Sequence, residues 1–195
     1  CTKESSRDFF YYCNQYSLDC SNEFNNVTFF TTKGSFDVEL YSETSPLTVS
    51  NFLRNINEQI YSDKEFYKII VFPSLKIIYS GINPNEFLSN VDIDYSQIGS
   101  SIPIEISLKG NSSQQYGNKI NDPIELSNLV NRFEPGTIAM VNVNENSSSS
   151  TEFFFTTDNM PELDGRYSIF GKVINGFEVL EKLEKNDKII KIEAF

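Results

Sequence analysis

The chain has 195 residues, of which 39% are hydrophobic and 14% aromatic, enough for one domain with a sizeable core. Its formal net charge of -11 repels phosphate backbones, so we expect no nucleic-acid partner. The chain has no histidine, which excludes catalytic triads and zinc sites that need an imidazole. We therefore expect no metal and no cofactor.

The N-terminal segment holds all three cysteines of the chain, Cys1, Cys13 and Cys20. Cys13 and Cys20 could close a small disulfide loop in an oxidising compartment, and three ordinary thiols fit the sequence equally well. Cys1, followed by polar residues, resembles the mature end of a bacterial lipoprotein, whose cysteine carries the lipid anchor. The alternative is a sequence cut at this position. We expect residues 1–26 to form a tether with one short helix and residues 27–195 to form the folded domain.

A β-hairpin is predicted from Val27 to Tyr41, because two runs with a period near two flank Lys33-Gly34. A helix is predicted next, with Ser45 as its N-cap and Pro46 in its first turn. Its apolar positions follow helical spacing, at residues 49, 52, 53 and 56.

Later segments predict short strands, loops and one more helix. Strands are expected at residues 77–81, 102–106, 137–142 and 189–195, and an amphipathic helix at 176–183. Three segments are expected to lack regular structure, namely a long loop at 83–99, an irregular stretch at 111–129 and a flexible run at 144–150.

The most specific stretch is TEFFFTTDNMPELDGRYSIFGKV, from Thr151 to Val173. Three phenylalanines, a loop ending in Asp164-Gly165 and a second apolar run predict strand, loop and strand. By itself this pattern is typical of any antiparallel hairpin.

As a whole, that string resembles the "QFFI…LDG…VFGKV" segment of cyclophilin-type peptidyl-prolyl isomerases, in which one phenylalanine floors the proline pocket. The segment TTKGSFDVELYSETSPLTVSNFL resembles the start of the same family. The Ile-Pro-Ile-Glu-Ile run and the serines before the three phenylalanines are most similar to the branch of photosynthetic bacteria and plastids. The resemblance implies a mostly β fold: a closed eight-stranded antiparallel barrel capped by two helices.

Rotation about an X-Pro bond meets a barrier of about 20 kcal/mol because amide resonance is lost. An isomerase needs no covalent step. It needs an apolar pocket for the proline ring, a donor that stabilises the twisted amide and groups that hold the flanking peptide.

Some positions match the residues that the family uses for these tasks. Phe154 matches the pocket floor, Leu163 the pocket wall and Asn142 the asparagine that holds the peptide. Val141 stands where the family has alanine, and Ile77 where it has methionine.

Other positions depart from the family pattern. The catalytic arginine is replaced by Lys68, which keeps the charge but lacks the planar fork of donors. Glu152 and Tyr79 replace glutamines, Tyr167 replaces a histidine, and Glu162 replaces a tryptophan. An ion pair between Lys68 and Glu152 is a further hypothesis, because it would occupy the candidate donor.

We therefore predict a weakly active peptidyl-prolyl cis-trans isomerase that assists protein folding outside the cytoplasm. The alternative is an inactive cyclophilin-fold module that binds Pro-containing peptides or a protein partner. A hydrolase using Glu152 and Glu162 is less favoured, because paired acids arise by chance in so acidic a sequence. We expect a monomer whose partners are Pro-containing peptides or unfolded proteins, and which contacts membranes only through a lipidated Cys1.

Overall fold

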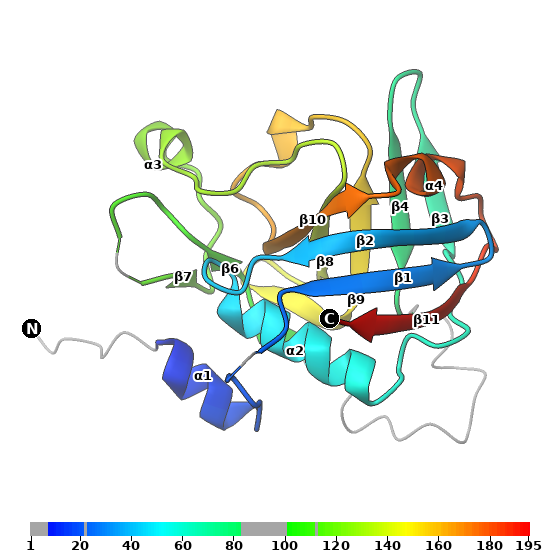
Figure 1. The fold of residues 1–195 in the computed structure, drawn as a ribbon. Helices are drawn as coiled ribbons and strands as arrows, with labels where there is room; N and C mark the ends of the chain where they lie inside the picture. The colour runs from blue at the N-terminus through cyan, green and yellow to red at the C-terminus, as the bar shows by residue number, and fades with distance from the viewer. Residues whose placement is uncertain (1–7, 22, 83–100, 112) are drawn as a thin grey trace, which may run out of the picture.

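The predicted hairpin begins the main sheet of the protein (Figure 1). The computed structural model describes residues 8–21, 23–82, 101–111 and 113–195. Strand β1 (Asn26–Thr31) pairs antiparallel with β2 (Gly34–Leu40). Gly34 opens β2 with a φ of 128°, a backbone conformation that side chains other than hydrogen disfavour.

A nine-stranded sheet follows the order β11-β1-β2-β10-β8-β9-β4-β3, with β5 also paired to β9. Its other strands are β3 (Lys68–Val71), β4 (Lys76–Ser80), β5 (Ser101–Pro103), β8 (Thr137–Asn142), β9 (Ser147–Thr156), β10 (Ile169–Asn175) and β11 (Ile189–Ala194). A separate pair joins β6 (Glu105–Ile106) to β7 (Gln115–Tyr116).

The prediction of a closed eight-stranded barrel is wrong in one respect: the sheet is curled but open. In the described part of the chain, β3 and β11 are the two ends of the sheet and do not pair with each other. Irregular backbone bonds join residues 63–66 to residues 186–189 beside these strands, including an isolated bridge between Glu65 and Lys188. Because this seam ends at Ile189, the rest of β11 has no second strand partner among the described residues.

Helix α2 (Pro46–Asn57) confirms the predicted helix, but its cap differs from the prediction. The Ser45 hydroxyl donates to the Ile169 carbonyl oxygen instead of capping the helix. The buried carboxylate of Glu105 accepts from the backbone N–H groups of Leu47 and Thr48, each at 2.9 Å. A side chain from a distant strand thus satisfies the first turn of α2.

The remaining helices are short. Helix α4 (Phe177–Lys182) confirms the second predicted helix, and η2 (Pro161–Leu163) is a 3-10 turn. The stretch 111–129, predicted to be irregular, contains β7 and helix α3 (Pro123–Ser127). The predicted loop at 83–99 lies outside the described residues.

Of the run 144–150 that was expected to be flexible, the four serines from residue 147 belong to β9, and Ser148, Ser149 and Ser150 are buried. The strand after this run approaches Gly81 closely. A Cβ atom at Gly81 would lie 2.3 Å from the carbonyl oxygen of Thr151. The Ser150 carbonyl oxygen also accepts from side-chain amides of α2, which ties the helix to the sheet.

The inner core lies between α2 and the concave face of the sheet, and phenylalanines dominate it. Its rings meet mostly edge-on or tilted, as between Phe52 and Phe153, whose centroids are 5.7 Å apart. The largest fully buried aromatic side chains are Phe29, Phe36, Phe52, Tyr61, Phe66, Phe153, Phe155 and Phe170 within this core.

The N-terminal segment contains helix α1 (Phe9–Gln15) and a Cys13–Cys20 disulfide. The Tyr12 ring packs on Tyr116 with centroids 4.9 Å apart, so α1 contacts the domain. Cys1 lies outside the described residues. Among the helices that the structure describes, none is long and apolar enough to span a membrane.

Candidate active site

Four directly opposed residues form a row across neighbouring strands on the outer face of the sheet. Lys68 of β3 lies opposite Tyr79 of β4, which lies opposite Phe154 of β9, which lies opposite Ala139 of β8. Directly opposed residues point to the same face of a sheet. Because side chains alternate along β9, Phe154 faces outward while its two neighbours enter the inner core.

Aromatic rings surround Phe154 on this face. Phe133 stacks on it with centroids 5.7 Å apart and ring planes only 10° apart. Tyr167 meets it edge-on at 5.1 Å, and Tyr79 lies at 5.6 Å. Together these contacts leave Phe154 only 3% exposed, so its ring is covered rather than open to solvent.

Most of the predicted binding residues meet in this outer cluster. The cluster joins buried Ile77 and Phe154 with partly buried Tyr79, Val141, Leu163 and Tyr167. These residues are distant in the sequence, since they come from β4, β8, β9, η2 and the loop between η2 and β10. Lys68, Asn142, Glu152 and Glu162 are the predicted site residues outside the cluster.

Lys68 is exposed, and its ammonium nitrogen lies 5.0 Å from the centroid of the Tyr79 ring. A cation in this position interacts favourably with the ring face. The ion pair proposed between Lys68 and Glu152 is wrong. Instead, the Tyr67 hydroxyl donates to the Glu152 carboxylate at 2.5 Å, and among the described residues Lys68 forms no ion pair.

Glu152 lies two residues before Phe154 on β9 and is buried. Burial raises the pKa of its carboxyl group above the usual value, while the hydrogen bond from Tyr67 acts in the opposite direction. The site therefore has a carboxyl group that takes up a proton more readily than an exposed glutamate.

The two other polar candidates hold different positions. The Asn142 side-chain amide donates to the Arg166 carbonyl oxygen at 2.8 Å, which links the end of β8 to the loop before β10. Glu162 is exposed on η2, whereas Glu152 is buried on β9 and its carboxylate accepts from Tyr67. The arrangement therefore offers no support for the hydrolase hypothesis.

The family model described as cyclophilin type peptidyl-prolyl cis-trans isomerase matches residues 26–193. The chain belongs to the cyclophilin family. Peptidyl-prolyl cis-trans isomerase CYP18-2 of Arabidopsis thaliana is 31% identical over 157 residues, which cover 80% of this chain and 79% of that protein. This result confirms the family resemblance seen in the two sequence segments.

Two further similarities concern the length and the fold of this cyclophilin. A putative thylakoid lumen peptidyl-prolyl cis-trans isomerase of Synechocystis is 28% identical over 84% of this chain, which spans only 45% of that relative. The crystal structure of a cyclophilin type isomerase from Cryptosporidium parvum superposes with a TM-score of 0.61 at 23% identity, covering 88% of this chain and 98% of that one. The latter supports the cyclophilin fold.

Several residues of the outer face of this cyclophilin were missed from the sequence, among them Phe133, Met160 and Tyr67. Phe133 and Met160 are buried in the outer cluster, and Tyr67 holds Glu152. The only sequence signal for Phe133 is its place just before the Pro-Gly turn. Its backbone N–H donates to the Asp164 carboxylate at 2.8 Å, a contact between distant segments that no local pattern reveals.

Among the described residues, no three His, Cys, Asp or Glu side chains gather into a group that could hold a metal ion. The chemistry available at the outer face is thus an apolar aromatic surface, one exposed ammonium group beside it and one buried carboxyl group.

Proposed function

We propose that this cyclophilin catalyses cis-trans isomerisation of X-Pro bonds during protein folding outside the cytoplasm, with slow turnover. The observation that carries the proposal is the row from Lys68 through Tyr79 to Phe154. It combines a cationic donor with an apolar aromatic surface on one face. Catalysis of X-Pro rotation requires both: the donor stabilises the twisted amide, and the apolar surface binds the proline ring.

In this proposal the proline ring packs against Phe154, Leu163 and Tyr167, while Lys68 donates to the twisted amide. Val141 and Asn142 at the end of β8 hold the flanking peptide, as the family resemblance suggests. A lysine offers a flexible point charge instead of a planar fork of donors, so it stabilises the transition state less well than arginine. This difference is the physical reason to expect slow turnover.

The Phe133 ring adds a second reason for slow turnover. It stacks on Phe154, so a proline ring reaches Phe154 only after Phe133 or Tyr167 has moved aside. Part of the binding free energy is then spent on opening the aromatic cluster, which weakens substrate binding.

A protease-coupled assay on a short X-Pro peptide tests the proposal. Lys68→Ala should abolish the catalysed rate, and Lys68→Arg should raise it, because the guanidinium restores the planar donors. Lys191→Ala is the matched control, since that ammonium also lies over an aromatic ring, at 4.8 Å from the Phe30 centroid, but on β11. Equal rates for wild type and Lys68→Ala would contradict catalysis through Lys68.

A second candidate function is a module that binds Pro-containing segments without isomerising them. The lysine at position 68 favours this candidate, because its ammonium group beside the aromatic cluster can hold a peptide but lacks the planar donors that stabilise a twisted amide. Calorimetric titration with an X-Pro peptide separates the two: binding without acceleration of isomerisation supports the module, and acceleration supports the enzyme.

Two observations support a location outside the cytoplasm. The Cys13–Cys20 disulfide suits an oxidising compartment, and the Synechocystis relative is named for the thylakoid lumen. Anchorage through a lipidated Cys1 stays a prediction, which mass spectrometry of the mature N-terminus in its native membrane tests. A monomeric state also stays a prediction, to be measured by sedimentation velocity.

A further inference from the structure

Among the described residues, the second half of β11 is an unpaired sheet edge. At its start, the Ile189 N–H donates to the Lys64 carbonyl oxygen, and its own carbonyl accepts from the Asp63 N–H, both at 2.8 Å. Beyond Ile189, β11 pairs with β1 alone in the part of the chain that the structure describes, and it is the terminal strand of the sheet order. An unpaired strand edge is a template for another chain.

The register shows which groups of β11 face outward. The Phe195 N–H donates to the Asn26 carbonyl oxygen, so in an antiparallel ladder Phe195 and Glu193 direct their backbone groups toward β1. The N–H and C=O groups of Ile192 and Ala194 then point away from β1. Within the described residues, no backbone group bonds to these outward groups.

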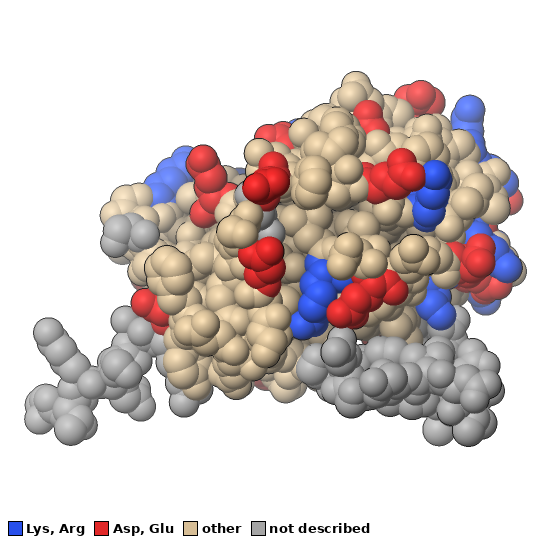
Figure 2. All heavy atoms as spheres, turned by 60° about the horizontal axis from the view of Figure 1, so that its bottom comes forward, with Lys and Arg blue, Asp and Glu red and all other residues tan. Residues whose placement is uncertain are grey.

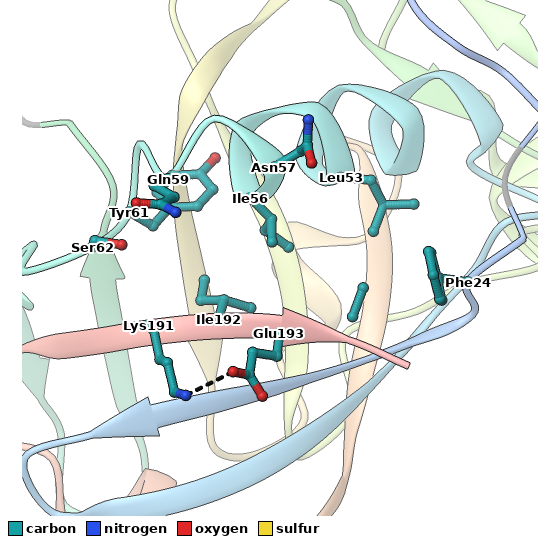
Figure 3. Close-up of a pocket in the computed structure, with 11 residues that line it drawn as sticks. Phe24, Leu53, Ile56, Asn57, Gln59, Tyr61, Ser62, Lys191, Ile192 and Glu193 are labelled. Atoms are coloured by element: carbon teal, nitrogen blue, oxygen red, sulfur yellow. Dashed lines mark hydrogen bonds and ion pairs between the residues drawn. The ribbon is translucent and has the colours of Figure 1, made fainter.

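A groove of about 520 Å³ runs along this edge, between β11 and α2. In Figure 3, Leu53 and Ile56 point from α2 toward β11, Phe24 lies at one end, and Lys191 and Glu193 point away from the helix. Lys191 forms an ion pair with Glu193 at 2.7 Å along the strand. Charged side chains on edge strands often prevent pairing with another chain. Lys191 does not do so here, because its ammonium group is held by Glu193 and points away from the groove.

The groove continues into a second hollow of about 640 Å³, since both are lined by Phe24, Leu53 and Asn57. The second hollow carries three carboxylates, from Asp19, Glu23 and Glu58.

Among the described residues, none of these three carboxylates forms an ion pair. The single arginine of the second hollow, Arg54, donates to the Asn51 side chain and the Tyr16 carbonyl oxygen. Acidic side chains are also spread over the face shown in Figure 2, with fewer basic ones between them. This end of the groove therefore favours a positive charge.

We propose that this groove binds an extended segment of a partner protein, which adds to β11 as a further strand. Its backbone bonds to the outward groups of Ile192 and Ala194, and alternate apolar side chains enter the groove against Leu53 and Ile56. A lysine or arginine at one end of the segment reaches the carboxylates of Glu23 and Glu58. The backbone edge provides affinity, and the acidic end provides selectivity for a basic segment.

This surface is separate from the outer cluster, because none of the residues that line the groove belongs to the cluster around Phe154. A bound segment thus leaves the isomerase face open. The protein would hold a client or an assembly partner at one surface and act on X-Pro bonds at the other.

The test uses fluorescence polarisation with a labelled peptide of about eight residues, alternating Val and Thr, with Arg at one end. Ala194→Pro removes one outward N–H and should weaken binding about tenfold. Phe195→Pro is the matched control, because it removes an N–H that faces β1, and it should leave the affinity within about twofold. Equal binding by wild type and Ala194→Pro, or no binding by wild type, would overturn the proposal.

Charge selectivity is tested in the same assay. Replacing the peptide Arg by Glu, or Glu58 by Lys in the protein, should each weaken binding about tenfold, and higher salt should reduce the difference. Glu181→Lys on α4 is the matched control outside the groove. If the two peptides bind equally, the acidic end plays no part and the proposal fails.

Sedimentation velocity distinguishes a partner segment from a second copy of the chain. If the wild type dimerises with increasing concentration and Ala194→Pro does not, β11 pairs with itself and the partner proposal is wrong. The isomerase assay on Ala194→Pro should give the wild-type rate, which separates this proposal from that for Lys68.

Discussion

Strand β9 carries two aromatic clusters on opposite faces, and the two differ in how tightly they are enclosed. Phe153 and Phe155 enter the inner core and have no exposed surface. Phe154 enters the outer cluster, where Tyr79, Tyr167 and other members are only partly buried. Adjacent residues of one type thus serve different purposes: the inner rings hold the fold, whereas the outer ring lies in a cluster that can rearrange.

The largest expected effect comes from the inner cluster. Phe153→Ala should lower the free energy of unfolding by about 3–5 kcal/mol, because the cavity left by the missing ring would be enclosed by other buried side chains. Phe154→Ala should cost less, since its partly exposed neighbours can collapse into the space. Urea unfolding of the two variants measures the difference. Equal losses would show that the two clusters are equally rigid.

Removing the ring that covers Phe154 sharpens the comparison. Phe133→Ala should lower the free energy of unfolding by about 3 kcal/mol and at the same time increase the affinity for an X-Pro peptide, because Phe154 becomes accessible. Calorimetric titration measures the affinity. Phe170→Ala, in the inner core, is the control and should destabilise the protein without tighter binding. Unchanged or weaker binding by Phe133→Ala would show that Phe133 forms part of the site.

The buried carboxyl group of the outer face predicts a pH effect. The pKa of Glu152 is raised above its ordinary value of 4.5 by burial, so the folded protein binds this proton more tightly than the unfolded chain does. Its stabilising contribution is present below pH 4.5 and is lost as the pH rises through the raised pKa. Unfolding of wild type and Glu152→Gln across this range should show the wild type losing stability relative to the variant.

Tyr67→Phe sharpens the same measurement. It removes the hydrogen bond that lowers the Glu152 pKa, so the pKa should rise further and the pH dependence should shift to higher pH. Carbon NMR of the glutamate carboxyl groups would detect the shift. A pKa that falls in Tyr67→Phe would mean that burial does not control this group.

The smallest expected effect is on exposed lysines. Lys68→Ala and Lys191→Ala each remove a cation lying over a ring, and each should change the free energy of unfolding by about 1 kcal/mol or less. Thermal unfolding measures both. A large loss in Lys68→Ala alone would assign that lysine a structural role and weaken the case for catalysis.

Local patterns predicted the elements whose signals lie within a few residues. The period-two runs around Lys33-Gly34 predicted β1 and β2, and helical spacing after Pro46 predicted α2. Of the ten site residues that the family resemblance predicted in the folded domain, six lie in one cluster. The prediction of a flexible serine run was wrong because composition alone indicated flexibility, whereas the serines pair with β5 and β8.

The sequence by itself determined the strand alternation that sends Phe153 and Phe155 to one face and Phe154 to the other, because that alternation is a property of any extended chain. Only the tertiary structure decided that Glu105 caps α2, that Phe133 covers Phe154 and that β11 has a free edge within the described residues. Each of these features joins segments that are distant in the chain. Their contacts depend on how the whole sheet curls, which no short window of residues specifies.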